Sequence, residues 1–95
     1  MMEAMLKEGA AQLQVFVEAG CSACERAKRL TREVAGDYPQ LAVSVMNIGD
    51  ARARHAEVFA VPTFVLDGRV LSLGNPQMSR LRGEIESLLR DRGLL

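Results

Sequence analysis

The chain has 95 residues, of which 48% are apolar, and its 12 basic and 12 acidic side chains give a formal net charge of zero. This length suits one domain with one modest core, and the apolar content excludes a disordered chain. The balanced charge lacks the basic bias of nucleic-acid-binding proteins, and no apolar stretch approaches the roughly 18 residues of a membrane span, so we expect neither as a partner.

Residues 1–11 are predicted to be a lead-in segment, either a short helix or disordered, before a domain at residues 12–92. The lead-in carries Glu3, Lys7 and Glu8 among its apolar residues. It therefore lacks the uninterrupted apolar core of a secretory signal. We expect the protein to be a cytoplasmic monomer.

The first predicted unit is a strand, a helix and a second strand. The first strand covers residues 12–18, where β-branched and aromatic residues form a short apolar run. After a turn at Gly20 and Cys21, the helix repeats apolar residues at steps of three and four and ends at Gly36. The second strand covers residues 41–48 and is apolar enough to be covered on both faces. Because a helical crossover joins them, the two strands should be parallel.

The second predicted unit is a short helix, a β-hairpin and a final helix. Asp50 is expected to cap the short helix over residues 51–59. Asp67 and Gly68 form a strong two-residue turn signal, which predicts an antiparallel hairpin of the apolar runs on either side. Asn75 is expected to cap the final helix, which a proline opens. Together the elements predict an α/β domain with a mixed four-stranded sheet.

The two cysteines of the chain, Cys21 and Cys24, stand three residues apart at the predicted start of the first helix. Residues at this spacing share one helix face, so their sulfurs can close a small disulfide ring. Persistent disulfides in the cytosol are usually catalytic or redox-sensing. A ring this short also removes little entropy from the unfolded chain, so stability is a weak reason for it. The pair predicts thiol–disulfide exchange.

Position on the helix assigns a role to each sulfur. Cys21 stands at the positive end of the helix dipole, where unpaired N–H groups favour a thiolate, so we assign it as the attacking cysteine. Cys24 lies one turn further in and should be more buried. It is assigned as the resolving cysteine, which attacks the mixed disulfide and releases the product.

Two other interpretations of the cysteine pair stay open. One is a redox-sensing or binding module whose dithiol records redox state with little turnover. The other is half of a zinc site, because this spacing also suits metal ligands. A structural zinc needs four ligands and His55 is the only histidine of the chain, so a symmetric dimer would have to supply two pairs.

The chain resembles the thioredoxin-like superfamily in its motifs and in their order. These are a strand, Cys21-Ser22-Ala23-Cys24, a helix, a strand, a helix and then a hairpin opened by Val61-Pro62-Thr63. The resemblance covers residues 12–92, and in length the chain is similar to glutaredoxins and small glutaredoxin-like thioredoxins. It implies a βαβ-α-ββα fold with helices on both faces of the sheet. It also implies a thiol–disulfide oxidoreductase that acts on disulfides of proteins or small molecules and is recycled by a reductase.

The resemblance implies a second half of the site, away from the cysteines in sequence. Pro62 would be a cis-proline beside the cysteine pair, and the backbone of Val61 would pair with a substrate strand. Thr63 belongs to the same docking segment. Gly74 and Asn75 would border the substrate site.

Several features of the family are missing from this chain. Gly20 replaces the tryptophan that precedes the first cysteine in thioredoxins. Their buried carboxylate falls at Val15 and its lysine partner near Val45, so the usual proton acceptor for the resolving cysteine is absent and water or Glu18 is left. The loop at residues 74–77 has no acidic residue of the kind that holds glutathione in glutaredoxins. We therefore expect no cofactor beyond the redox-active disulfide.

Overall fold

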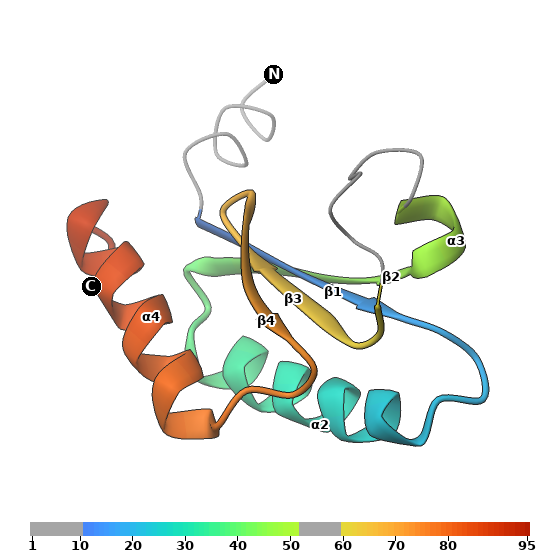
Figure 1. Ribbon diagram of the computed structural model, residues 1–95. Helices are drawn as coiled ribbons and strands as arrows, with labels where there is room; N and C mark the ends of the chain where they lie inside the picture. Colours follow the sequence, from blue (N-terminus) through green and yellow to red (C-terminus); the bar gives the residue numbers. More distant parts are fainter. Residues whose placement is uncertain (1–10, 52–59) are drawn as a thin grey trace.

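The computed structural model describes residues 11–51 and 60–95, and its four strands form one sheet (Figure 1). The elements in chain order are β1 (Ala11–Val17), α2 (Ser22–Asp37), β2 (Leu41–Asn47), α3 (Ile48–Ala51), β3 (Thr63–Leu66), β4 (Arg69–Leu73) and α4 (Met78–Asp91). The predicted lead-in before residue 11 and most of the helix predicted over residues 51–59 lie outside the described residues.

The sheet has the strand order β2-β1-β3-β4. β1 pairs in parallel with β2, and it pairs antiparallel with β3, which forms the hairpin with β4. The predicted mixed sheet is therefore confirmed. Asp67 and Gly68 both have positive φ values, 54° and 84°, as a tight two-residue hairpin turn requires.

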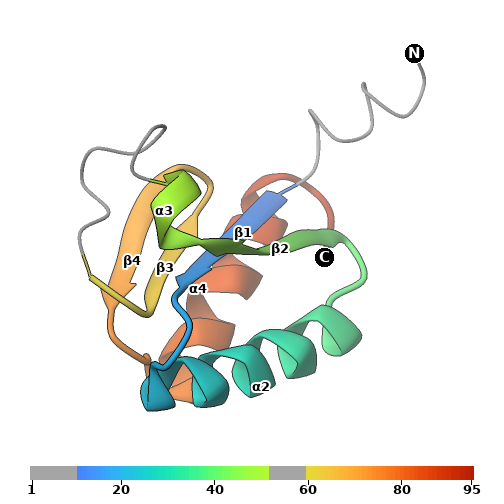
Figure 2. The same cartoon turned by 90° about the vertical axis from the view of Figure 1, so that its right-hand side faces the viewer.

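Helices lie on both faces of the sheet, as expected. α2 and α4 cover one face (Figures 1 and 2), and together with the sheet they bury the main core. Its fully buried members include Leu13, Val15, Cys24, Phe64, Leu81, Ile85 and Leu89. On the other face a smaller cluster of Phe16, Ile48 and Val65 lies beside α3. β1 is an inner strand of the sheet, and its residues Val15, Phe16 and Val17 next to the cysteine segment are all buried, so its end is a firm support for the segment that follows it.

β2 differs from the prediction, because its face away from α2 is only partly covered, by Met46 packing against the smaller cluster. It lies at the edge of the sheet, and Ala42 and Ser44 on the face away from α2 are exposed. Val45 is 45% exposed even though it follows Leu41 and Val43 on the α2 face. The apolar run indicates a strand, but strand order decides which of its faces find a partner layer.

Three predicted helix ends are also corrected. α2 runs past Gly36 to Asp37. Asp50, the expected cap of the short helix, lies inside α3. At the start of α3 the side chain of Asn47 instead accepts a hydrogen bond from the Gly49 N–H at 2.8 Å. α4 begins at Met78 with Gln77 as its N-cap, two residues after the predicted cap at Asn75. At α3 the local hydrogen bond to Asn47 competes with the cap signal of Asp50.

A polar clasp joins the end of α2 to α4. Arg82 forms an ion pair with Asp37 at 2.6 Å, and its guanidinium lies 5.8 Å from the centre of the Tyr38 ring. The Tyr38 hydroxyl donates a hydrogen bond to the Glu86 carboxylate. This hydrogen bond, followed by burial of the ring, raises the pKa of Tyr38 above its usual value. The clasp holds the far end of α2, opposite the cysteine pair.

Candidate active site

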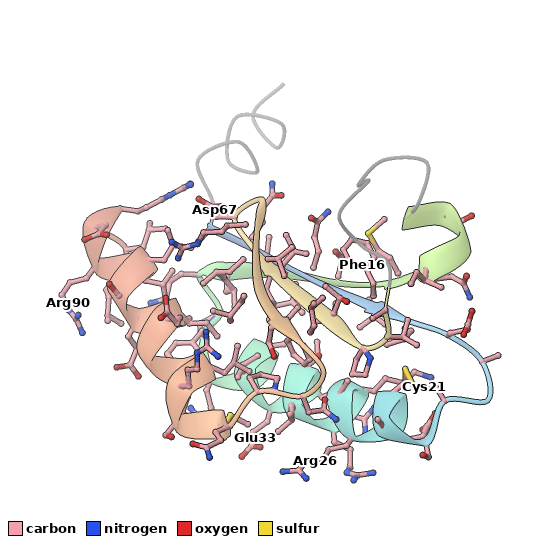
Figure 3. The ribbon with its side chains drawn as sticks, in the orientation of Figure 1. Phe16, Cys21, Arg26, Glu33, Asp67 and Arg90 are labelled. Carbon is pink, nitrogen blue, oxygen red and sulfur yellow. A yellow bond between two sulfur atoms is a disulfide. The ribbon has the colours of Figure 1, made fainter. Side chains whose placement is uncertain are left out.

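The cysteine pair lies at the start of α2, just after the segment that connects β1 to this helix, at the right of the view in Figure 3. Gly20 has a φ of +80°, which lets the chain turn into the helix at low cost. Cys21 is the N-cap of α2 and Cys24 lies in its first turn. The two sulfurs form a disulfide, with the Cα atoms 5.2 Å apart. The predicted placement on one helix turn is confirmed, with Cys21 one position earlier than expected.

The two sulfurs have different surroundings. Cys24 is fully buried in the main core, while Cys21 is partly exposed at its margin. The N–H of Cys24 donates a hydrogen bond to Cys21 Sγ at 3.1 Å. The Cys21 side chain thus occupies the place of a capping oxygen, and an N–H of the helix start faces its sulfur. Such a donor stabilises a thiolate more than a neutral thiol.

The segment expected to lie beside the cysteines begins at a cis-proline, as the resemblance implies. The peptide bond between Val61 and Pro62 is cis, and the Pro62 side chain is buried. Val61 packs against the same apolar cluster as Cys21. Thr63 is fully buried, and its hydroxyl donates to the carbonyl of Ala60 at 2.6 Å. These contacts place residues 61–63 at the margin of the cluster that holds the exposed sulfur.

The loop after β4 joins the two halves of the site. The N–H of Gly74 donates to the carbonyl of Pro62 at 2.6 Å. The side-chain amide of Asn75 donates to the carbonyl of Ala23, between the two cysteines, at 3.0 Å. These two hydrogen bonds connect the segment at Pro62 and the turn between the cysteines to the same loop. Sequence reasoning missed the contact of Asn75 with Ala23, because an asparagine before a proline looks like an ordinary helix cap.

The positions of the missing carboxylate and lysine are occupied by two neighbouring valines. Val15 on β1 and Val45 on β2 are partners in the parallel register, so they share one face of the sheet. Val15 is fully buried in the cluster that contains Cys24, whereas Val45 is partly open to solvent. Glu18, just after β1, is exposed. The surroundings of Cys24 are therefore more apolar than the family pattern implies.

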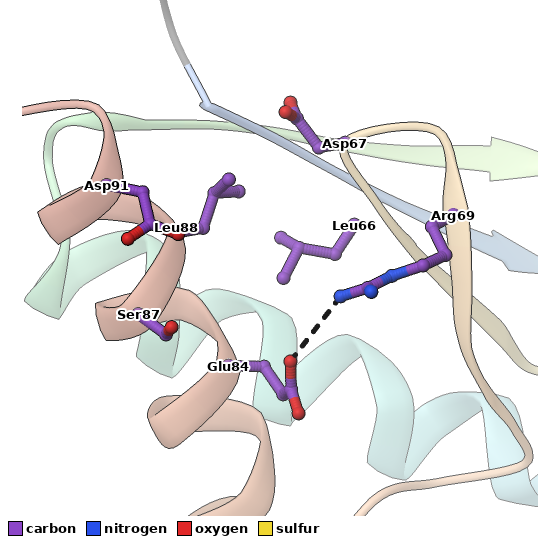
Figure 4. A pocket seen from close by; sticks show the side chains of 7 residues that line it. All are labelled: Leu66, Asp67, Arg69, Glu84, Ser87, Leu88 and Asp91. Carbon is purple, nitrogen blue, oxygen red and sulfur yellow. Dashed lines mark ion pairs between the residues drawn. The ribbon is translucent and has the colours of Figure 1, made fainter.

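A cavity of about 320 Å³ lies at the other end of the sheet, between the β3–β4 turn and α4 (Figure 4). Its side chains include Asp67, Arg69, Glu84 and Asp91, and an ion pair of 3.6 Å joins Arg69 to Glu84 across it. It contains neither cysteine nor any residue of the docking segment. Because the cavity holds neither sulfur, we assign the chemistry to the cysteine end.

Within residues 11–51 and 60–95, no group of three or more histidine, cysteine, aspartate or glutamate side chains is arranged to hold a metal ion. His55, the only histidine, lies outside these ranges. No helix in the described part of the chain is long and apolar enough to cross a membrane.

A sequence model of the thioredoxin domain family matches residues 11–89, which is most of the chain. The chain belongs to this family. A thioredoxin of Methanocaldococcus jannaschii is 31% identical over 81 residues, a match that spans 82% of this chain and 95% of that protein. Family membership and the cysteine pair together make this thioredoxin-domain protein a thiol–disulfide oxidoreductase.

Solved structures show the same fold. The thioredoxin of Trypanosoma brucei brucei superimposes with a TM-score of 0.71 at 17% identity, covering 94% of this chain and 83% of that one. The Fasciola hepatica thioredoxin gives a TM-score of 0.69 at 23% identity, covering 90% and 89%. At such low identity these likenesses concern the fold alone, and they confirm the predicted thioredoxin-like architecture.

Proposed function

We propose that Cys21 is the nucleophile of this oxidoreductase and that Cys24 is its resolving cysteine. The observation that carries the assignment is the asymmetry between the sulfurs. Cys21 is accessible and accepts the N–H of Cys24 at 3.1 Å, whereas Cys24 is fully buried. A donor at the helix start lowers the pKa of a thiol, and burial in an apolar core raises it.

In the proposed reaction the Cys21 thiolate attacks one sulfur of a substrate disulfide. A mixed disulfide forms, and the other substrate sulfur leaves as a thiolate. Cys24 then loses its proton and attacks Cys21 Sγ, which breaks the mixed disulfide and releases the second substrate thiolate. The substrate gains two electrons and two protons, and the domain is left with the Cys21–Cys24 disulfide. A reductase, proposed as the partner, returns the electrons.

The docking segment supplies a backbone surface for the substrate. The hydroxyl of Thr63 and the N–H of Gly74 already have partners inside the protein. Their proposed contribution is therefore the shape of the site. Val61 is partly exposed and packs against the same cluster as Cys21, and we assign to its backbone the pairing with an extended substrate segment.

We further propose that the protein works as a cytoplasmic monomer without a bound cofactor. Residues 74–77 offer no acidic group to hold the amino end of glutathione. Disulfide-containing proteins are the proposed substrates rather than nucleic acids or membranes, in keeping with the zero net charge.

An insulin-reduction assay with dithiothreitol as electron donor tests this function. The wild type should accelerate insulin reduction, and Cys21→Ser should abolish the acceleration. When the reduced Cys24→Ser variant is mixed with insulin after dithiothreitol has been removed, it should instead accumulate a mixed disulfide with the substrate, visible by mass spectrometry. A wild type that leaves the rate at the level of dithiothreitol alone would rule out catalytic turnover.

One observation favours a second function, a redox sensor with slow turnover. Val15 and Val45 take the places of the carboxylate and lysine, so no protein group of that pair can remove the Cys24 proton. A sensor would form the disulfide readily but release a mixed disulfide slowly.

Elemental analysis of protein purified without chelator tests the third interpretation, the zinc-bridged dimer. This dimer requires about half an equivalent of zinc per chain, since four thiolates bind one ion.

A further inference from the structure

A side chain of the loop after β4 reaches the backbone between the two cysteines. Asn75 Nδ2 donates to the carbonyl of Ala23 at 3.0 Å, a contact between residues 52 positions apart. Because a backbone carbonyl can only accept, the amide nitrogen must be the end that faces it. The Oδ1 of the same side chain is buried and has no hydrogen-bond partner in the described part of the structure. The donor end therefore accounts for this placement.

The carbonyl that Asn75 binds and the N–H that faces Cys21 belong to the same peptide group. The Ala23 carbonyl is bonded to the nitrogen of Cys24, and the Cys24 N–H donates to Cys21 Sγ at 3.1 Å. In a trans peptide group the C=O and N–H point in opposite directions. The two hydrogen bonds thus form one chain, from the Asn75 amide through a peptide group to the sulfur. Hydrogen bonds in such a chain polarise and strengthen one another.

We propose that Asn75 is a positioning residue that stabilises the Cys21 thiolate through the Ala23–Cys24 peptide group. The inference rests on the proposed role of Cys21 as the nucleophile. Asn75 does not touch the reacting sulfur. Its donation to the Ala23 carbonyl makes the Cys24 N–H a stronger donor and holds that N–H in line with Cys21 Sγ.

The effect should be larger in the reduced protein than in the oxidised one. In the disulfide the sulfur is a weak neutral acceptor, and the Cys24 N–H is shared with the Cys21 carbonyl, also at 3.1 Å. After reduction the sulfur carries a charge, and a charge-assisted hydrogen bond is about twice as strong as a neutral one. Asn75 therefore favours the dithiol state of the pair.

The first test measures the Cys21 thiolate directly. The ultraviolet absorbance of the thiolate is measured against pH in the Cys24→Ser variant, in which Cys21 is the remaining thiol. The same titration is repeated after adding Asn75→Ala or Asn75→Asp to this variant. Without the Asn75 donor, the charge-assisted hydrogen bond from the Cys24 N–H to the thiolate should be weaker. The pKa of Cys21 should then rise by about half a unit, which leaves about threefold less thiolate at a pH below that pKa. Asn75→Asp keeps the shape, loses the donor and adds a negative charge, so its increase should be larger.

Gln77→Ala is the matched control, because Gln77 lies in the same loop, is exposed and makes no side-chain cap hydrogen bond. It should leave the pKa of Cys21 unchanged. In proteins that keep both cysteines, the ratio of disulfide to dithiol is measured after equilibration with glutathione. This ratio should be about threefold higher in Asn75→Ala than in the wild type, and unchanged in Gln77→Ala.

The outcomes separate this inference from the proposed function. If the wild type fails to exchange disulfides at all, the proposed function is wrong. If the wild type exchanges disulfides but Asn75→Ala and Asn75→Asp match Gln77→Ala in both the thiolate titration and the glutathione equilibrium, the role of Asn75 alone is refuted. Circular dichroism of each variant verifies that the comparison is between folded proteins.

Discussion

Replacing Val15 with aspartate should speed release of the mixed disulfide and weaken the fold. Val15 is fully buried and lies in the same apolar cluster as Cys24. Losing a buried valine side chain costs about 1.5–3 kcal/mol. Burying a carboxyl group without a full set of partners adds about 1–3 kcal/mol. We expect the free energy of unfolding to fall by about 3–5 kcal/mol, while the new carboxylate gains access to the proton of Cys24.

Val15→Asn is the matched control, because asparagine has the shape of aspartate but cannot accept the thiol proton. Desolvation raises the pKa of a buried carboxyl group, so its folded value lies above its unfolded value. The aspartate variant therefore loses stability relative to the asparagine variant as pH rises above about 4, where the unfolded chain ionises. Urea denaturation at several pH values measures this difference. Val45→Lys, in register on β2, should recover part of it.

The functional readout is the release of an aromatic thiol from a mixed disulfide with Cys21, a step that requires attack by Cys24. The rate should be higher in Val15→Asp than in Val15→Asn, and the advantage should disappear at low pH as the carboxylate becomes protonated. Equal release rates in the two variants across the whole pH range would refute the idea that the missing carboxylate limits the resolving step.

Three further changes test the scaffold. Tyr38→Phe removes the hydrogen bond to Glu86 and should cost about 1 kcal/mol; since that bond raises the pKa of Tyr38, the wild-type advantage should be constant below pH 10 and vanish above it. An advantage that persists in strong alkali would contradict this linkage. Ile85→Ala opens a cavity at a fully buried site and should cost about 3 kcal/mol in urea denaturation, and a loss below about 1 kcal/mol would mean that the core closes around it. In Gly20→Ala the new Cβ meets no atom within 4 Å, so only the +80° φ is strained and the loss should stay near 1 kcal/mol, with disulfide exchange retained.

Much of the candidate site could be predicted from the sequence, because its strongest signals are local. Cysteines three residues apart after an apolar strand must meet on one helix turn wherever the helix lies. The turn at Asp67 and Gly68 needs two residues that tolerate positive φ, and an aspartate followed by a glycine is a residue pair that predicts such a turn. Resemblance to the thioredoxin-like superfamily then linked Pro62 to the cysteines, a link that spacing alone could not supply.

Other features depended on which elements become neighbours. The apolar composition of β2 predicted burial on both faces, but Ala42 and Ser44 on the face away from α2 are exposed in this edge strand. Asn75 was predicted as a cap, since helix signals are read from adjacent residues. Its donor instead meets the Ala23 carbonyl, a partner that exists only after β3, β4 and α2 have packed together.

The sequence by itself determined the redox pair and the order of the elements, because periodicity, turn residues and the cysteine spacing act over a few positions of the chain, and its resemblance to the thioredoxin-like superfamily indicated the family. The greater burial of Cys24 was expected from its place on the helix, but only the tertiary structure decided how completely it is buried and which groups surround the two sulfurs. Cys24 is buried because α2 packs on β1 and β2, and the Cys21 sulfur is joined to Asn75 through a peptide group because the loop after β4 closes over the helix start. Burial and hydrogen-bond partners are properties of contacts between distant residues, so they appear only when the chain has folded.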